Sequence, residues 1–373
     1  MATAAIQISN PTAIKFTRKK LDKLHMDTAK SAAAIDLVYT TDTIAGISRK
    51  QKNGGWTYSH DGKTIKDKET LDRIKKLVIP PAWQNVWISP IANSHLQVTG
   101  TDAMGRKQYK YHTLWTTLRN QTKFSHLYEF GKALPTIRKQ LEKHMALPGL
   151  PHEKVMATII ALLQCTCIRI GSNEYEKLYG SFGLTTMKDK HVQINGSEVK
   201  FEFKGKKGVY HKINLKSKKL ARIVQQCRDI PGKELFQYYD DNGKRKPVDS
   251  GMVNSYIKVI SGGDFTAKDF RTWAGTLQAI EAFKEKGTVD GITATKKVIV
   301  EVLDIVAEKL GNTRAVCKKY YVHPVVIDHY TNNTLRKFLE QKNTAACSDS
   351  IELSTDEKIM MKILESTAAH IIV

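Results

Sequence analysis

Apolar residues recur at helical spacing over most of the chain from about residue 124 onward. Val155, Ile159, Leu162, Leu163 and Cys167 share one face of such a helix, and Gly171 supplies a stop. The same spacing predicts further helices from Ser217, from Thr266 with Asp269 as its capping partner, and from about residue 293 to Leu310-Gly311. A short helical turn carries Tyr320-Tyr321, and Pro324 can begin the next helix. This part of the chain is therefore predicted to be mainly helical.

One interval within the helical part alternates between apolar and polar positions instead. Val192 and Ile194 precede Asn195-Gly196, which is a strong signal for a hairpin turn. Residues 199–203 alternate after it, Gly205-Lys206-Lys207-Gly208 forms a second turn, and residues 209–215 alternate again. The pattern predicts three antiparallel strands, with Lys206 and Lys207 at a hairpin tip.

Residues 44–120 are mixed and rich in turns, with short strand-like runs at 86–88 and 95–98. We expect an α+β protein with a small antiparallel-β N-terminal domain over residues 1–122. A larger, mostly α-helical domain with the three-stranded hairpin sheet would cover residues 123–373. Two domains suit a chain of 373 residues, since single cores stop growing at roughly 250–300 residues.

Charge changes this picture, because 59 Lys and Arg residues face only 37 Asp and Glu residues, a formal net charge of +22. Such a surplus, spread along a folded chain, favours a polyanionic partner and above all nucleic acid. No apolar run approaches the ~18 residues of a membrane span, and the N-terminus lacks the pattern of a signal peptide. The five cysteines show no paired spacing, so we expect reduced thiols and an intracellular protein.

Several kinds of chemistry lack their sequence signatures. Cys165 and Cys167 have no second pair, and no cluster of His, Cys or Asp residues has the spacing of a metal site, so we expect no metal. The Gly205-Lys206 pair lacks the first glycine and the Ser or Thr of a phosphate-binding Walker loop, so we expect no nucleotide.

Polar residues in apolar or turn settings are the remaining candidates for a site. Arg169 lies in an apolar segment, where its charge requires a partner, and Arg271 lies between Phe270 and Trp273. Asn312 follows a helix-ending glycine, and Tyr321 lies nine residues further on. From spacing alone, Arg169 could equally form a structural ion pair, Asn312 could be a helix-terminal residue, and Tyr321 could be a packing aromatic. Lys206 could be an ordinary solvated turn lysine.

Together these segments resemble one family, the type IB DNA topoisomerases, in its compact bacterial and large-DNA-virus form. The motifs are Ile-Arg-Ile-Gly-Ser-Asn-Glu-Tyr (168–175), Phe-Lys-Gly-Lys (203–206), Lys-Asp-Phe-Arg-Thr (268–272) and Leu-Gly-Asn-Thr…Tyr-Val-His-Pro (310–324). Upstream, Ile79-Pro80-Pro81-Ala82-Trp83 and Gly105 to His112 resemble the N-terminal domain of that family. The resemblance covers about residues 45–335, in the family's order.

The resemblance implies that Tyr321 attacks a DNA phosphodiester and forms a 3′-phosphotyrosyl link. Arg169 and Arg271 would neutralise charge at phosphorus, and Lys206 would protonate the departing 5′-oxygen. Asn312 stands where poxvirus enzymes have His, and would donate a hydrogen bond to a phosphate oxygen. Strand rotation and religation would then relax supercoiled DNA without ATP, metal or any other cofactor.

The resemblance also implies residues that contact double-stranded DNA. They are Arg106, Lys107, Gln108, Tyr109 and Tyr111 in the N-terminal domain, and Tyr175 in the catalytic domain. A basic strand and turn with no such role is the alternative for the N-terminal segment. We expect a monomer that clamps the duplex, located in the bacterial cytoplasm and nucleoid or, for a viral protein, in the virion or the DNA compartment of infected cells.

Some positions depart from the family pattern or compete with the assigned residue. Ser172 stands where some viral members have lysine, Tyr320 neighbours Tyr321, and Lys207 neighbours Lys206. We prefer Tyr321 because Val-His-Pro follows it directly.

Two other functions compete with this interpretation. Tyrosine recombinases share the Arg, Lys and Tyr residues, but they carry His-x-x-Arg at the second arginine, where this chain has Lys268. A non-catalytic architectural DNA-binding protein would show the basic surface without forming a covalent adduct.

Overall fold

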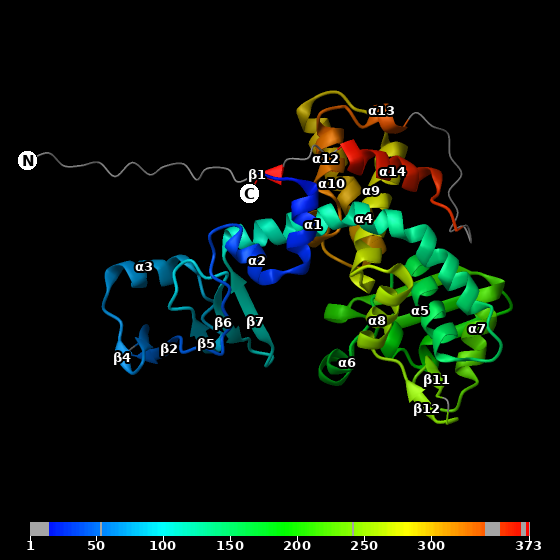
Figure 1. Cartoon of the computed structure of the whole chain (residues 1–373), viewed down its shortest axis with the longest axis horizontal. Helices are drawn as coiled ribbons and strands as arrows, with labels where there is room; N and C mark the ends of the chain where they lie inside the picture. The colour runs from blue at the N-terminus through cyan, green and yellow to red at the C-terminus, as the bar shows by residue number, and fades with distance from the viewer. Residues whose placement is uncertain (1–14, 53, 241, 340–350, 367–370, 373) are drawn as a thin grey trace, which may run out of the picture. The chain divides into compact units, whose positions relative to one another are not determined.

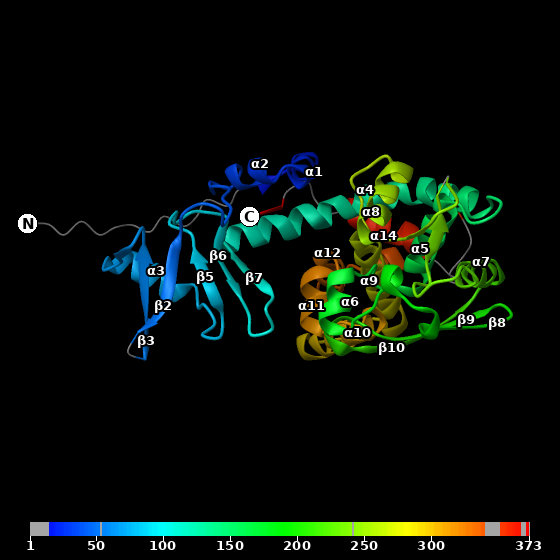
Figure 2. The ribbon, with the colours of Figure 1, turned by 90° about the horizontal axis from the view of Figure 1, so that it is seen from below.

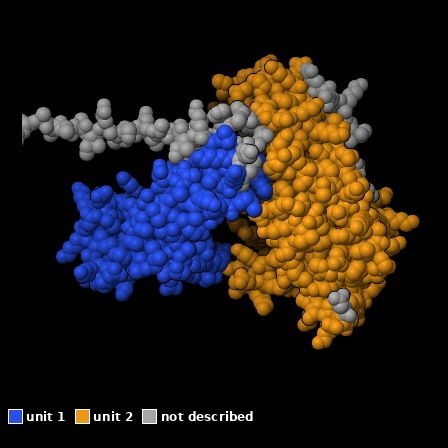
Figure 3. Space-filling model, in the orientation of Figure 1, with its two compact units in different colours: residues 1–126, 368–373 blue, residues 127–367 orange. Residues whose placement is uncertain are grey.

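The computed structural model describes residues 15–52, 54–240, 242–339, 351–366 and 371–372. It divides into two compact units, coloured separately in Figure 3: unit 1 comprises residues 1–126 and 368–373, and unit 2 comprises residues 127–367. From the sequence we expected a boundary between two independently folding domains at residues 122 and 123. That domain boundary stays a prediction.

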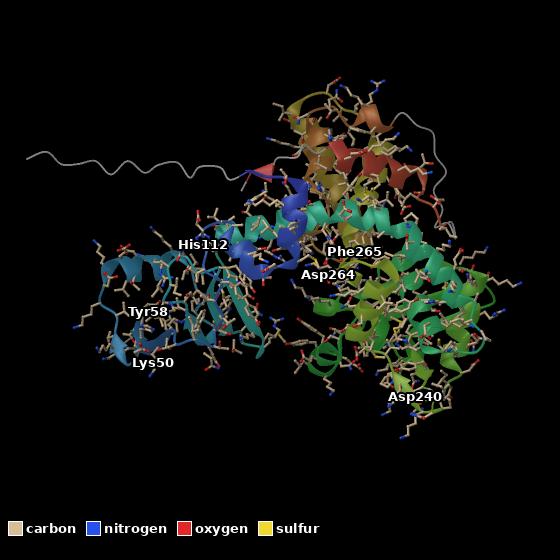
Figure 4. All side chains as sticks on the ribbon, in the orientation of Figure 1. Lys50, Tyr58, His112, Asp240, Asp264 and Phe265 are labelled. Atoms are coloured by element: carbon tan, nitrogen blue, oxygen red, sulfur yellow. The ribbon has the colours of Figure 1, made fainter. Side chains whose placement is uncertain are left out.

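Unit 1 is built on a six-stranded antiparallel sheet in the order β4-β3-β2-β5-β6-β7 (Figure 1). Its strands are β2 (Ile47–Lys52), β3 (Gly55–His60), β4 (Lys63–Thr64), β5 (Gln84–Ile88), β6 (Leu96–Thr101) and β7 (Lys107–Tyr111). Lys50 and Tyr58, labelled in Figure 4, lie on the paired strands β2 and β3. The strand run predicted at 86–88 is confirmed as part of β5, and the run predicted at 95–98 is confirmed from Leu96 onward as part of β6.

Two small cores hold unit 1 together. Helix α3 (Lys68–Lys76) buries Ile74 against the sheet, where Ile47, Val86, Ile88 and Val98 are also buried. The second core lies under α1 (Arg18–Met26), α2 (Thr28–Ala33) and the start of α4 (Thr113–Met145), with β1 (Lys15–Phe16) paired to β13 (Ile371–Ile372). Phe16, Leu21, Ile35 and Leu118 are among its buried residues.

Helix α4 corrects one expectation from the sequence. The helical pattern was expected to begin at about residue 124, but α4 runs unbroken from Thr113 to Met145 and includes the polar run Asn120-Gln121-Thr122. The hydroxyl of Thr122 donates to the carbonyl of Arg119 within the same helix, so this polar residue is accommodated without a break.

Unit 2 is mainly helical around one continuous core. Its α-helices, besides residues 127–145 of α4, are α5 (His152–Thr166), α6 (Asn173–Tyr179), α7 (Lys218–Arg228), α8 (Ser250–Ser261), α9 (Ala267–Lys286), α10 (Ile292–Leu310), α11 (Arg314–Tyr320), α12 (Pro324–Thr331), α13 (Arg336–Leu339) and α14 (Thr355–Ser366). Helix α9 packs against α5, α8, α10, α12 and α14, so it is the central element of this unit. None of the helices in the described ranges has the length and apolar character needed to span a membrane.

The predicted three-stranded sheet is confirmed. Strands β8 (Val192–Asn195), β9 (Glu198–Lys204) and β10 (Tyr210–Lys216) pair antiparallel and lie side by side in Figure 2. The turn between β9 and β10 contains the short 3-10 helix η3 (Lys206–Gly208). Two further 3-10 helices, η1 (Leu184–Thr186) and η2 (Asp189–His191), precede the sheet, and a small hairpin of β11 (Gln237–Tyr239) and β12 (Arg245–Pro247) follows it.

Helix ends follow the predicted signals with one exception. Thr266 caps α9, and its backbone N–H donates to Asp269 Oδ2 at 2.8 Å. The preceding residues Asp264 and Phe265 are labelled in Figure 4. Gly311 ends α10 in the left-handed conformation, as expected. Helix α5 was expected to continue through Cys167 to Gly171, but it ends at Thr166, and Cys167 itself adopts a left-handed conformation with φ of 55°. The chain then continues in a non-helical segment that carries Arg169.

Candidate active site and nucleic-acid interface

A cavity of about 260 Å³ in unit 2 brings most of the predicted site residues together. Arg169, Lys206, Arg271 and Tyr321 all line it, as does Tyr175. These residues come from four separate stretches of the chain, so the fold, and not local sequence, creates the cluster. Asn312 does not line this cavity.

Arg169 is half-buried and donates to neutral oxygen atoms. Its Nη2 atom lies 2.5 Å from Asn312 Oδ1 and 3.0 Å from the carbonyl oxygen of Gly311. No carboxylate forms an ion pair with it within the described residues, so a structural ion pair, the alternative considered above, finds no support. Burial lowers the pKa of Arg169 to about 10, and the positive charge of Arg271 contributes to this shift. The guanidinium is nevertheless charged at neutral pH.

Arg271 projects from the second turn of α9 and is only 5% exposed. It donates to the carbonyl oxygen of Cys167, and its Nη2 donates to that of Leu310 at 2.8 Å. The left-handed turn at Cys167 and the C-terminus of α10 thus provide its two acceptors. Its buried Nε atom has no hydrogen-bond partner in the described part of the chain. An unsatisfied donor on a buried cation is uncommon, which makes it a candidate contact for an anion.

Tyr321 lies at the C-terminus of α11, and α9 holds its backbone. The Thr276 hydroxyl donates to the Tyr321 carbonyl oxygen at 3.1 Å and accepts from the backbone N–H of His323 at 3.1 Å. A Cβ atom at Gly275 would lie 2.9 Å from the Tyr321 carbonyl oxygen and 3.1 Å from its Cβ, so only glycine allows this approach. The ring of Tyr321 lies 5.3 Å from the guanidinium carbon of Arg271.

Lys206 lies on the β9–β10 turn, as predicted. Its Nζ atom is 5.2 Å from the centre of the Tyr175 ring, within the range of a cation–π contact. Lys207 has a left-handed backbone with φ of 61°, is exposed and does not line the cavity. The geometry therefore favours Lys206 over its neighbour as a site residue.

The Asn312 side chain is linked to the cavity by its hydrogen bond with Arg169. Its side-chain oxygen accepts from Arg169, which leaves the amide nitrogen as the only side-chain donor, at 3.5 Å from the carbonyl oxygen of Leu310. An amide fixed in this way can donate one hydrogen bond to a ligand but cannot titrate.

Lys268 is a lining residue that the sequence reasoning did not assign to the site. It lies one turn before Arg271 on α9 and lines the same cavity. The i, i+3 spacing of the two residues was the available signal, because such residues share a helix face. Ser172, which departs from the family pattern, also lines the cavity.

The predicted DNA-contacting residues of unit 1 lie on the edge strand β7 and the turn before it. Lys107, Tyr109 and Tyr111 are exposed along one face of β7, and the rings of the two tyrosines stack 6.1 Å apart. Gln108 alternates to the other face, where its Nε2 atom donates to Asp102 at 2.9 Å. An edge strand with exposed Lys and Tyr side chains suits contact with a polyanion.

Arg106 and Lys107 each have a carboxylate partner. Arg106 contacts Asp102 with Nη2 at 2.6 Å and Nε at 2.7 Å, and the hydrogen bond from Arg106 lowers the pKa of Asp102 to about 2. Lys107 Nζ lies 2.5 Å from Asp42, whose pKa is likewise lowered by that contact.

Among the residues that the structure describes, no group of His, Cys, Asp and Glu side chains is arranged to hold a metal ion.

Comparison with known proteins identifies relatives over most of the chain. Residues 111–347 match the family model of the eukaryotic DNA topoisomerase I catalytic core, and residues 55–102 match that of the bacterial DNA topoisomerase IB N-terminal domain. The chain is 32% identical to the DNA topoisomerase 1B of Acanthamoeba polyphaga mimivirus over 311 residues, which cover 80% of this chain and 91% of that protein. It is 24% identical to the DNA topoisomerase 1B of vaccinia virus (strain Western Reserve) over 239 residues, 64% of this chain and 73% of the relative.

Proposed function

Because the chain belongs to the type IB DNA topoisomerases, we propose that the cavity lined by Arg169, Lys206, Arg271 and Tyr321 is its active site. The single observation that carries this proposal is the convergence of a tyrosine, a lysine and two arginines on one cavity. Neither a tyrosine recombinase nor an architectural protein is favoured by the relatives described above.

Tyr321 is the nucleophile of the proposed reaction. Its phenol loses its proton to solvent, the phenolic oxygen forms a bond to a backbone phosphorus of DNA, the bond from phosphorus to the 5′-oxygen breaks, and a 3′-phosphotyrosyl link results. One phosphodiester replaces another, so the step is nearly isoenergetic and religation by the 5′-hydroxyl is its reverse. The contact of Tyr321 with Gly275 and Thr276 supports this role, because it fixes the backbone from which the phenol projects.

Arg169 and Arg271 stabilise the negative charge on the non-bridging oxygens in the transition state. Both are buried or half-buried and bind only neutral acceptors in the described chain, so their positive charge is not cancelled before DNA arrives. The unpartnered Nε of Arg271 gives one donor for a phosphate oxygen. Burial is the main cause of the lowered pKa of Arg169 and the charge of Arg271 adds to it, so a bound phosphate would offset this shift by adding a negative charge beside the two arginines.

Lys206 is the general acid that protonates the departing 5′-oxygen. A deoxyribose alkoxide is a poor leaving group, so cleavage needs this proton. Asn312 donates its amide hydrogen to a phosphate oxygen while its carbonyl oxygen orients Arg169. Tyr175, beside Lys206, contributes a further phosphate contact.

DNA is the substrate, and we infer that unit 1 binds it through Arg106, Lys107, Gln108, Tyr109 and Tyr111. The protein would act as a monomer whose two domains clamp the duplex, while the free end rotates and releases supercoils. Phosphate contacts would dominate this interface, so affinity should fall steeply with salt.

The test is relaxation of negatively supercoiled plasmid in EDTA without ATP, followed by denaturation of the reaction in detergent. The proposal expects relaxed topoisomers and protein attached to the 3′ end of a nicked strand. Digestion of the adduct and mapping of the nucleotide-bearing peptide should identify Tyr321 and not Tyr320. An adduct on a 5′ end, or a nucleotide on another residue, would overturn the assignment.

A further inference from the structure

His211 lies next to the proposed site but has no assigned role. It belongs to β10, opposite Phe203 of β9, and its ring stacks on the Phe203 ring at 5.1 Å with an angle of 20° between the planes. Alternation along β10 places His211 on the same face as Ile213 and Leu215, both packed against the core of unit 2. One face of the imidazole is therefore supported by a buried aromatic residue.

The edge of the same ring occupies space left by two glycines. A Cβ atom at Gly205 would lie 2.6 Å from His211 Cδ2 and 2.7 Å from Nε2, and one at Gly311 would lie 3.0 Å from Nε2. Gly205 has φ of −92°, which any residue can adopt, so backbone strain does not require glycine there. The ring of His211 is the physical reason for a glycine at this position.

These two glycines flank two different parts of the site. Gly205 directly precedes Lys206 on the β9–β10 turn, and Gly311 directly precedes Asn312, whose side chain holds Arg169. The turn and the loop lie more than a hundred residues apart in the sequence, and the His211 ring contacts both. No hydrogen bond to the His211 ring nitrogens occurs in the described part of the chain. The ring therefore contacts its neighbours through van der Waals packing. Burial lowers the pKa of His211, and the charges of Arg169 and Arg271 lower it further, so the ring adds no positive charge at neutral pH.

We propose that His211 is a positioning residue whose ring holds the Lys206 turn against the loop of Gly311 and Asn312. This inference rests on the proposed role of Lys206 as the general acid. Backbone hydrogen bonds from Gly205 to Val209 and from Gly208 to Gly205 shape the turn of residues 205–209. Proton transfer from Lys206 to a 5′-oxygen also requires that this turn be held in place relative to the rest of the site. A misplacement of about 1 Å in an active site can lower the rate by about 10²-fold.

The test compares single-turnover cleavage of two duplexes, one with an ordinary phosphodiester and one with a 5′-bridging sulfur at the scissile position. The sulfur leaving group is acidic enough to depart without a proton from Lys206. We expect His211→Ala to slow cleavage of the ordinary duplex by about 10²-fold and that of the sulfur duplex much less. His211→Phe keeps a flat ring without nitrogens and should stay close to the wild type on both. Ile213→Ala, the next inward residue of β10, is the control for general damage to the strand.

Two results would overturn the inference. Equal slowing of both duplexes by His211→Ala would show that the ring does not act through Lys206. Loss with His211→Phe as large as with His211→Ala would show that the nitrogens, and not the shape of the ring, are needed. Thermal unfolding of each variant identifies any that is simply unfolded, and the His211→Phe comparison stays informative if His211→Ala fails to fold.

A second experiment tests the contact itself. Gly205→Ala would push on the His211 ring, and we expect it to slow cleavage. In the double variant with His211→Ala the clash is absent, so the combined loss should be clearly smaller than the product of the two single losses. Strictly multiplicative losses would contradict the contact.

Lys206→Ala is the reference variant, because it tests the role of Lys206 as general acid separately from the role of His211. If it is not rescued by the sulfur duplex, the proposed role of Lys206 fails, whatever His211 does. If Lys206→Ala is rescued but His211→Ala is not, only the inference about His211 fails.

Discussion

The cations that we propose to act on DNA have different partners in the two units. In unit 1, Arg106 and Lys107 are exposed or half-exposed, and each contacts a carboxylate, Asp102 or Asp42. In unit 2, Arg169 and Arg271 are half-buried or buried and donate to backbone carbonyl and amide oxygens, with no acidic partner in the described ranges. The first arrangement is typical of a surface that binds and releases DNA, and the second of a preorganised catalytic site.

The two units also differ in packing, and this difference explains how unit 2 can bury two arginines without acidic partners. Unit 1 has two small cores, whereas unit 2 has one continuous core crossed by α9. Two buried charges of the same sign are unfavourable: burial lowers the pKa of Arg169, and the charge of Arg271 lowers it further. A large rigid core can hold them in place without acids, and the carbonyl oxygens of Cys167, Leu310 and Gly311 give partial compensation. We therefore expect changes in unit 2 to alter the rate of cleavage and changes in unit 1 to alter affinity.

Tyr321→Phe should have the largest effect. Loss of the phenolic oxygen removes the nucleophile, so no covalent adduct should form, while non-covalent DNA affinity stays nearly unchanged because only a hydroxyl is lost. Adduct formation in detergent and an equilibrium binding titration measure the two quantities. Tyr320→Phe is the matched control and should retain cleavage. Full relaxation by Tyr321→Phe would reject Tyr321 as the nucleophile.

Arg271→Ala should come next, with cleavage slowed by about 10²–10³-fold at saturating DNA, because one preorganised donor group for the transition state is lost. Arg106→Ala, in unit 1, should instead leave the cleavage rate at saturation near that of the wild type and weaken binding. The DNA affinity of this variant should also depend less steeply on salt. Loss of one phosphate contact should reduce the slope of log affinity against log salt concentration by about 0.9. A rate loss for Arg106→Ala as large as that for Arg271→Ala would remove the distinction between the units.

The sequence predicted the elements of unit 2 well, because its signals are local. The Asn195-Gly196 turn and the alternation around it fixed three strands, and Thr266 with Asp269 fixed the start of α9. The convergence of Arg169, Lys206, Arg271 and Tyr321 could be expected only through the family resemblance. Spacing alone left open an ion pair for Arg169, a solvated turn for Lys206 and a packing role for Tyr321.

Other features depend on contacts that the sequence does not display. The early end of α5 at Thr166 is tied to the hydrogen bond between Arg271 and the Cys167 carbonyl, a contact between residues 104 positions apart. Helix α4 continues through Asn120-Gln121-Thr122, where the Thr122 hydroxyl donates to the carbonyl oxygen of Arg119 in the same helix. The roles of Gly205 and Gly275 appear only when the neighbouring His211 and Tyr321 are in place.

Gly275→Ala should have an intermediate effect in unit 2. Alanine suits a helix better than glycine by about 1 kcal/mol, so the helix itself should not be weakened. Its methyl group would press on the Tyr321 carbonyl oxygen and Cβ, and we expect cleavage to slow by about tenfold through displacement of the phenol. Gly131→Ala is the control, because its methyl group would meet the Trp273 ring at 2.6 Å and should lower the melting temperature instead. An unchanged cleavage rate for Gly275→Ala would show that the close approach does not position Tyr321.

Asp42→Asn should have the smallest effect, and it should strengthen DNA binding where the other changes weaken a function. Asparagine keeps an acceptor for the Thr99 hydroxyl, which donates to Asp42 at 2.9 Å, but it no longer neutralises Lys107. An exposed ion pair contributes about 0–1 kcal/mol, so releasing Lys107 should tighten duplex DNA binding by at most about fivefold and steepen its salt dependence. A change of pH would not do this in the neutral range, because the contact with Lys107 lowers the pKa of Asp42 from its already acidic ordinary value, so the carboxylate stays ionised throughout that range. Asp72→Asn on the exposed face of α3 changes the net charge equally. If it tightens binding as much as Asp42→Asn, total charge and not the partner of Lys107 determines affinity in unit 1.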